Sequence, residues 1–484
     1  MRSKAREIDI QPSDRVAFIH LPKTAGTTFN AILEPLLSGL TYCPEYFLTG
    51  LVQPDLDELR KFQLFRGHFP YALFSDIIFP EGFIGLTFLR DPVQRTMSNY
   101  KFMQHLLTQD HLLELPQYAD EFEQIKHLGL PGLLARTDLK INRDWVNFQT
   151  GFLGSSMEPS FLFPVFLLKL FPGKEFLLQD RYSRLRSRVN DIYIFGKYEN
   201  KDVTRTTLDL ARQRLREIAF LGLVERFQDS LFLLSYTFGW RPIPDATRLN
   251  VTPEKDKWKP ADPETLARIR DMVRLDLELY QFGQDIFEGR FNDMTQALLR
   301  RYGKKEHAKL RWPLPADVMV QFLEQNYLDR RDRRAQQDGT AADEYLYQPA
   351  MKVEGPFGWY PPDFSPVHGR MCWSGPGLNS GFDLPCPSGT NLRVCFRILM
   401  ALRPTIIEEL SLTVNNLPVR LDHSVDPEGA FVFTGEILPA AVSGPFLRLV
   451  FSVPETIVPG TVDSDNRDPR RLGILLNWVK LQAG

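Results

Sequence analysis

The stretch FIHLPKTAGTTFNAIL (18–33) joins a short apolar strand to an amphipathic helix through a loop of small residues. The apolar run ends at Leu21, and the seven residues after it separate the strand from the helix. Such a loop presents backbone N–H groups in a concave nest, and the helix that follows adds its positive N-terminal end. Lys23 adds a mobile charge, and two threonines add hydroxyl donors. The stretch therefore predicts a phosphate-binding loop.

This loop differs from a Walker A motif. That pattern reads GxxxxGK[ST], whereas Lys23 precedes Gly26 and no glycine stands directly before the lysine. For this stretch taken alone, the alternative is an ordinary strand–turn–helix with a chance lysine.

A second stretch of the same kind is GLTFLRDPVQRTMSNYKFM (85–103). An apolar strand ends at Leu89, Arg90 stands at its carboxyl end, and the following Asp-Pro pair suits a helix cap and a first helical turn. Ser98 lies eight residues after Arg90, about two turns into that helix. An arginine can bind a phosphate bidentately while the serine hydroxyl donates to it. The alternative is an internal ion pair for Arg90 and a neutral helix surface position for Ser98.

Strands and helices alternate through the first part of the chain. The apolar runs at 15–21, 83–89 and 191–197 predict strands. Helical patterns begin near Thr27 and Val93 and span 203–218, 222–236 and 263–291. This alternation predicts an α/β fold with a parallel sheet flanked by helices, which binds its ligands at the carboxyl ends of the strands.

The last part of the chain has a different pattern. It consists of short apolar runs broken by turn residues: NLRVCFRIL, LSLTVNN, AFVFTGEIL, FLRLVFSV and LGILLNWVKL. Such runs predict a C-terminal all-β sandwich. We expect a first domain at 1–310, a helical and polar linker at 311–349, and the sandwich at 350–484. The arginine-rich stretch 328–344 is expected to be a solvated linker or helix end rather than a contact with an anionic surface.

Length and composition narrow the class of protein. A chain of 484 residues with 43% hydrophobic and 24% charged residues is globular rather than disordered. Its net charge of −2 argues against a general nucleic-acid binder. We expect no membrane-spanning helix, because no apolar run reaches about 18 residues. The start of the chain lacks the apolar stretch of a signal peptide, and four cysteines do not make a disulfide framework, so a cytoplasmic location is expected.

Together, KTAGTT (23–28) after one strand and RDPVQRTMSNY (90–100) after another resemble the motifs of the carbohydrate sulfotransferases. The greatest similarity is to the heparan sulfate 2-O-sulfotransferase-like enzymes and their bacterial relatives. NFQTGFLG (147–154), GLVERFQDSLFLLSYTFGW (222–240) and NVTPEK (250–255) resemble further segments of that family. The resemblance covers about residues 14–290.

The resemblance implies a P-loop-like fold and transfer of a sulfonate from 3′-phosphoadenosine 5′-phosphosulfate (PAPS) to a saccharide, with adenosine 3′,5′-bisphosphate as product and without a metal. In this family the first loop binds the 5′-phosphosulfate, which gives that role to Lys23, Thr24, Ala25, Gly26, Thr27 and Thr28. The arginine and serine of the second motif bind the 3′-phosphate, which gives that role to Arg90 and Ser98. The loop that closes over the nucleotide suggests Thr252 and Lys255 as further contacts.

A general base is needed to take the proton of the attacking hydroxyl. His68, in LFRGHFPYALF, is the candidate, since it follows a glycine where the chain can turn toward a cleft. The 2-O-sulfotransferases resemble this segment and use the histidine after the glycine in catalysis. They carry a second histidine just before that glycine, where this chain has Arg66. Arg66 either contacts an acidic sugar or pairs with a carboxylate, and the alternative for His68 is a buried structural histidine.

Other functions fit parts of the sequence. The aromatic residues Trp359, Tyr360 and Trp373 could stack on sugar rings, although packing in the sandwich core is favoured. A tail domain of this kind could hold a polymeric acceptor or mediate homo-oligomerisation. An ATP-dependent P-loop kinase is a second enzyme hypothesis, but the sequence shows neither clear Mg²⁺ ligands nor a Walker lysine. A glycan-binding protein with a vestigial nucleotide site is the third.

Overall fold

The computed structural model describes residues 4–37, 39–46, 56–108, 128–136, 145–156, 203–243, 262–304, 314–338, 344–387, 391–442, 444–466 and 468–483. These residues form two compact units. The first unit comprises Met1–Thr28, Thr41–Phe238 and Ile243–Met319, and the second comprises Phe29–Leu40, Gly239–Pro242 and Val320–Gly484.

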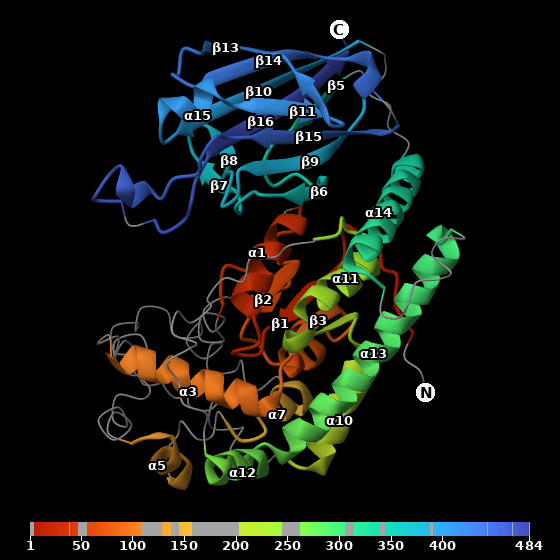
Figure 1. Ribbon diagram of the computed structural model, residues 1–484, viewed down its shortest axis with the longest axis vertical. Coiled ribbons are helices and arrows are strands. Elements are labelled where there is room, and N and C mark those ends of the chain that lie inside the picture. The colour runs from red at the N-terminus through yellow and green to blue at the C-terminus, as the bar shows by residue number, and fades with distance from the viewer. Residues whose placement is uncertain are drawn as a thin grey trace. The chain divides into compact units, whose positions relative to one another are not determined.

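The first unit is built on a four-stranded parallel sheet (Figure 1). The strand order is β2 (Leu64–Gly67), β1 (Val16–Ile19), β3 (Ile84–Leu89) and β4 (Phe220–Leu223), and every neighbouring pair is parallel. The strands are almost completely buried, as expected for a parallel sheet covered on both faces. All four carboxyl ends therefore lie along one edge, and the predicted parallel α/β fold flanked by helices is confirmed.

Two of the four strands were not predicted. The apolar runs at 15–21 and 83–89 form β1 and β3, and the run at 191–197 lies outside the described residues. β2 and β4 have only four residues each, too few for a period to distinguish a strand from a helix. The predicted helix at 222–236 is wrong at its start, because β4 and the 3₁₀ turn Val224–Arg226 come before α11 (Phe227–Phe238).

The helices in the first part of the chain follow the predicted pattern with one break. The first helix, α1 (Gly26–Leu36), begins at the loop after β1, and α3 (Pro92–Thr108) begins after β3. The pattern at 203–218 forms α10 (Arg205–Glu217). The long helix predicted from residue 263 is two helices, α12 (Pro263–Met272) and α13 (Arg274–Tyr302), which meet at Val273. Shorter helices are α2 (Leu56–Leu59), α5 (Leu130–Ala135) and α7 (Phe148–Gly154), with a π-helix at Leu73–Ile78.

The second unit contains two antiparallel sheets (Figure 1). The larger sheet has the order β13 (Leu421–Val425), β14 (Phe431–Ile437), β10 (Leu392–Ala401), β16 (Ile474–Ala483), β8 (Gly369–Trp373) and β7 (Asp363–Ser365), and β5 (Glu344–Tyr347) also pairs with β16. The smaller sheet has the order β12 (Leu417–Val419), β11 (Ser411–Val414), β15 (Phe446–Ser452), β9 (Asn379–Pro385) and β6 (Glu354–Phe357). The short helix α15 (Pro404–Glu408) follows β10.

One apolar core joins the two antiparallel sheets. All five apolar runs found in the sequence form strands there: β10, β11, β14, β15 and β16. Phe396 on β10 and Phe451 on β15 meet edge to face, with ring centroids 5.1 Å apart. Trp359 is buried in this core, and its indole N–H donates to the Gly381 carbonyl at 3.2 Å. The core-packing interpretation is therefore confirmed for Trp359.

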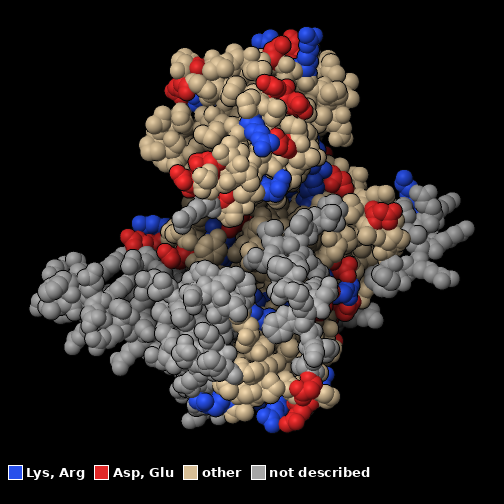
Figure 2. All heavy atoms as spheres, turned by 60° about the vertical axis from the view of Figure 1, so that its left-hand side comes forward, with Lys and Arg blue, Asp and Glu red and all other residues tan. Residues whose placement is uncertain are grey.

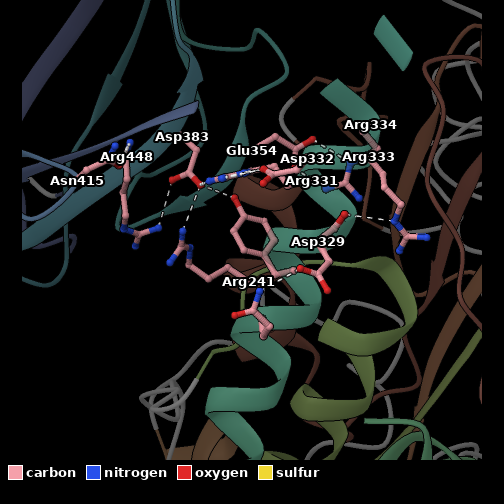
Figure 3. Close-up of polar contacts among 12 residues, drawn as sticks. Arg241, Asp329, Arg331, Asp332, Arg333, Arg334, Glu354, Asp383, Asn415 and Arg448 are labelled. Carbon is pink, nitrogen blue, oxygen red and sulfur yellow. Dashed lines mark hydrogen bonds and ion pairs between the residues drawn. The ribbon is translucent and has the colours of Figure 1, made fainter. Parts of the chain in front are cut away.

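A buried carboxylate connects helix α14 (Ala316–Asp338) to the antiparallel sheets (Figure 3). Asp383 on β9 is fully buried and accepts hydrogen bonds from the Tyr327 hydroxyl at 2.6 Å and from Arg331 at 2.8 Å. Arg241 at 3.1 Å and Arg448 at 3.3 Å complete the ion pairs of the same carboxylate. A buried charge requires such partners.

The stretch 328–344 was expected to be a solvated linker or helix end, and α14 does end within it, at Asp338, with Arg333 exposed. The expectation is wrong for Arg330 and Arg331. Arg330 and Arg331 are 2% and 8% exposed, because this part of α14 packs in the second unit. On the face drawn in Figure 2, the basic and acidic side chains of the described residues are interspersed, as the near-zero net charge suggests. None of the helices in the described ranges is both long and apolar enough to cross a membrane.

Candidate functional site

Each strand of the parallel sheet is followed by a polar side chain at the same edge. Lys23 lies in the loop between β1 and α1, and His68 directly follows β2. Arg90 directly follows β3, and Glu225 lies just after β4. Because the strands are parallel, the topology brings together residues that are more than 200 positions apart in the sequence. Ligands bind at this edge in open α/β sheets.

The loop between β1 and α1 holds two non-glycine residues in the left-handed region. Lys23 has φ 68° and Ala25 has φ 63°. This conformation is uncommon for residues with a side chain, and it marks loops whose shape is imposed by their function. The Thr24 hydroxyl donates to the Leu21 carbonyl at 2.7 Å, so this buried side chain closes the turn. The sequence motif thus produces a tight, strained loop at a helix N-terminus.

Gly26 is required by the histidine beside it. A Cβ atom at Gly26 would lie 1.7 Å from Nε2 of His20. The sequence analysis placed His20 inside the first strand, whereas β1 ends one residue earlier and the imidazole packs under the loop. Burial, His68 and Lys23 hold the pKa of His20 well below its ordinary value, so this ring is neutral at pH 7.

Lys23 and Arg90 place two cations close together. Burial lowers the pKa of Lys23 to about 8, with a further contribution from Arg90. The Lys23 ammonium lies 4.1 Å from the ring centroid of Phe102, and within the described part of the chain it forms no ion pair. Arg90 Nη1 donates to the Lys23 carbonyl at 2.9 Å. Such a pair of cations at a helix N-terminus suits an anionic group.

A hydrogen-bond chain that the sequence analysis missed holds the backbone of Arg90. Gln149 accepts from the Arg90 amide at 3.1 Å and donates to the Arg90 carbonyl at 2.9 Å. Asp276 on α13 is fully buried and accepts from the amide of Gln149 at 3.1 Å and from the amide and hydroxyl of Thr150, each at 2.7 Å. Only the segment NFQTGFLG had been singled out in the sequence. The role of Asp276 was missed. The signal in the sequence that could have revealed it is an acidic residue on the apolar face of a long helix.

His68 is fixed through one ring nitrogen. Its Nδ1 lies 2.9 Å from the carbonyl oxygen of His20, and its ring centroid lies 4.2 Å from that of His20. A carbonyl oxygen only accepts hydrogen bonds, so Nδ1 carries the proton and Nε2 of the neutral ring is left as an acceptor. Burial lowers the pKa of His68 below its ordinary value, which favours this neutral form.

Arg66 packs between two tyrosines. Its guanidinium carbon lies 4.6 Å from the ring centroid of Tyr42 and 4.5 Å from that of Tyr46, and the residue is 4% exposed. Tyr42 is 41% exposed and Tyr46 is 38% exposed. The guanidinium of Arg66 is therefore stacked between the two rings, and its aromatic neighbours carry the exposed surface.

The remaining candidate residues lie in the β1–α1 loop, on helices that begin at this edge, or outside the described residues. Thr27 is exposed in the first turn of α1, Thr28 beside it is buried, and Ser98 is half-buried on α3. Asp91 accepts from the Gln94 amide at 2.8 Å, which confirms the predicted cap of α3. Thr252 and Lys255 fall outside the described residues.

Comparison with known proteins gives relatives of one kind. The chain is 24% identical over 354 residues to heparan-sulfate 6-O-sulfotransferase 2 of Danio rerio, across 65% of this chain and 67% of the relative. It is 22% identical over 320 residues to heparan-sulfate 6-O-sulfotransferase 1 of Homo sapiens, across 60% of this chain and 70% of the relative. It is 23% identical over 373 residues to heparan-sulfate 6-O-sulfotransferase 2 of Gallus gallus, across 70% of this chain and 80% of the relative. No family model matches the chain.

These relatives support a carbohydrate sulfotransferase family for this chain. They are named for 6-O transfer, so the similarity to 2-O-sulfotransferases stays a prediction. The structural comparison finds a family 35 carbohydrate binding module from Clostridium thermocellum (TM-score 0.20, 10% identity, 30% of this chain and 100% of that one). It also finds a family GH115 4-O-methyl-α-glucuronidase (TM-score 0.20, 11% identity, 63% of this chain and 44% of that one). At this TM-score neither likeness bears on the function.

Proposed function

We propose that this protein transfers a sulfonate from PAPS to a hydroxyl group of a saccharide. The observation that carries the proposal is the convergence of Lys23, His68 and Arg90 at the carboxyl edge of one parallel sheet. The sulfotransferase relatives support the same reaction class, and their names point to a glycan as acceptor.

The residues at this edge fit a nucleotide that carries several negative charges. Lys23 and Arg90 form a cation pair, and the loop that carries Lys23 leads into the N-terminus of α1. An anion at this position would offset the burial and the repulsion from Arg90 that lower the pKa of Lys23. When bound, PAPS supplies a sulfonate on a phosphate leaving group. Lys23 then holds a positive charge where negative charge develops on the leaving oxygen.

His68 has the tautomer that a general base needs. The bond from Nδ1 to the His20 carbonyl orients the ring and leaves Nε2 to accept the proton of the acceptor hydroxyl. The lowered pKa keeps this nitrogen unprotonated at neutral pH. Gln149 acts as a positioning residue: its two hydrogen bonds fix the backbone of Arg90 and so position the Arg90 guanidinium.

The test is a turnover assay with the full chain. PAPS is supplied with fully desulfated heparan sulfate or other unsulfated polysaccharides, and adenosine 3′,5′-bisphosphate is quantified by chromatography. We expect product formation that depends on a saccharide and is lost in Lys23→Ala. Saccharide-dependent turnover that persists unchanged in both Lys23→Ala and His68→Ala would overturn the assignment, as would consumption of ATP in place of PAPS.

A further inference from the structure

The second unit carries a hollow on the outer face of its larger sheet. Its volume is about 320 Å³, within the range of small-ligand pockets. Three of its lining residues lie on β14, β10 and β16, which are neighbouring strands of this sheet (Figure 1). The hollow is lined by Arg397, Asp426, Pro427, Glu428, Val432 and Trp478.

Strand register explains why these residues meet. Arg397 on β10 is directly opposite Val432 on β14 and directly opposite Trp478 on β16. All three side chains are half-buried, whereas their strand neighbours Phe396 and Val479 point into the core. The period of two along a strand therefore places an indole, a guanidinium and an aliphatic group in one row on the outer face.

Hydrogen bonds fix the polar side chains that line the hollow, Arg397, Asp426 and Glu428. Arg397 Nε donates to Asp426 at 2.7 Å, Nη2 donates to Glu428 at 2.6 Å, and Nη1 donates to the Asn477 side-chain oxygen at 3.0 Å. Asp426 also accepts from the amides of Glu428 and Ala430, each at 2.9 Å, which fixes the turn between β13 and β14. The hydrogen bond from Arg397 lowers the pKa of Glu428, so this carboxylate is ionised at neutral pH.

This combination of groups matches the two kinds of surface that a sugar ring presents. The half-buried indole of Trp478 offers a flat apolar face for C–H groups, and within the described residues its N–H has no hydrogen-bond partner. The ionised carboxylates retain lone pairs that can accept from hydroxyl groups, since each oxygen can accept more than one bond.

The charges disfavour an anionic ligand. Arg397 balances only one of the two carboxylates, Asp426 and Glu428, so these three groups keep a net negative charge that repels a polyanion. We propose that this hollow is a second saccharide-binding site, built around Trp478, Arg397, Asp426 and Glu428, which takes neutral sugar units of a glycan. The site goes beyond the proposed transfer reaction and is independent of its donor residues.

The test is affinity electrophoresis of the full chain in gels that contain hydroxyethylcellulose, glucomannan, arabinoxylan or glycol chitin, with heparin as the anionic probe. We expect retardation by at least one neutral polysaccharide. Trp478→Ala should weaken this retardation at least tenfold and Glu428→Gln several-fold. The matched controls Trp373→Phe and Glu436→Gln alter the same unit outside the hollow and should bind normally, as should Lys23→Ala.

Three outcomes would overturn the second site. These are no retardation by any neutral polysaccharide, retardation by heparin alone, and neutral binding that survives Trp478→Ala, which would place the binding elsewhere. Circular dichroism of every variant, and adenosine 3′,5′-bisphosphate binding of the variants in the second unit, confirm that they are folded. Loss of saccharide binding in Trp478→Ala with nucleotide binding intact separates this site from the proposed transfer site.

Discussion

The Nδ1 atom of His68 lies 2.9 Å from the carbonyl oxygen of His20. This one hydrogen bond joins the ends of β2 and β1 and determines which nitrogen of His68 can take a proton. It links the strand order of the sheet to the chemistry proposed at its edge, because only neighbouring parallel strands place these two residues side by side.

Replacing His68 should separate chemistry from nucleotide binding. General base catalysis contributes about 10²–10⁴-fold to a rate, so His68→Ala should lower kcat by that factor. The affinity for adenosine 3′,5′-bisphosphate should stay within a few-fold of wild type, since Lys23 and Arg90 are intact. Steady-state kinetics and calorimetry measure the two effects. An equal loss of both would show that His68 supports the fold rather than the reaction.

The pH dependence of kcat/KM should be bell-shaped. His68 must be neutral to act as base, and its pKa is lowered from 6.5, so activity should rise with pH on a limb below pH 6.5. Lys23 must be protonated, and its pKa is about 8, so activity should fall above pH 8. In Lys23→Arg the alkaline limb should move beyond pH 10, because guanidinium stays protonated. An unmoved alkaline limb would assign it to another group.

Adding a methyl group at Gly26 should disrupt the loop. The new Cβ would overlap His20 Nε2, which lies 1.7 Å from its position, so the ring or the loop must shift. Gly26→Ala should lower the midpoint of thermal unfolding and abolish nucleotide binding. Gly129→Ala is the matched control in the same unit, since the nearest atom lies 3.8 Å from its Cβ. Normal binding by Gly26→Ala would contradict the close packing of His20 under the loop.

Gln149 should act through the position of Arg90. Gln149→Ala removes both hydrogen bonds to the Arg90 peptide and should weaken adenosine 3′,5′-bisphosphate binding about tenfold, equivalent to ~1.4 kcal/mol. AMP, which lacks the 3′-phosphate, should lose much less affinity. Calorimetric titration with both nucleotides compares them. Equal losses for both would indicate a general structural defect.

Removing Asp383 should destabilise the second unit. Asp383→Ala leaves Arg241, Arg331 and Arg448 near one another without their shared carboxylate (Figure 3). Breaking a buried ion pair costs about 3–5 kcal/mol. Urea unfolding should show this loss, whereas Asp422→Ala on the exposed strand β13 should change stability little. Equal stability of the two variants would contradict the role of Asp383.

Much of the fold follows from local sequence patterns. β1, β3 and five strands of the second unit were recognised because each belongs to a longer apolar run in the sequence, and Asp91 caps α3 as expected. The strands β2 (LFRG) and β4 (FLGL) were missed because an arginine and glycines interrupt their short apolar runs. Val273 breaks the long helix at a point where the sequence offers neither glycine nor proline.

The site could be predicted only in part. Lys23, His68 and Arg90 were singled out because each follows a short apolar run in the sequence. The bonds from Asp276 to Gln149 and Thr150 join positions 127 and 126 residues apart, which no local pattern reveals. The burial of Arg330 and Arg331 depends on tertiary packing as well, so a run of charges in the sequence was taken for a solvated surface.

The most direct test of the central claim is calorimetric titration of the full chain with adenosine 3′,5′-bisphosphate, ATP and AMP. The arrangement of Lys23 and Arg90 predicts binding of the 3′-phosphorylated nucleotide at least tenfold tighter than of the other two, and its loss in Arg90→Ala. Preference for ATP, or an Arg90→Ala variant with unchanged affinity for adenosine 3′,5′-bisphosphate, would contradict the proposed donor site.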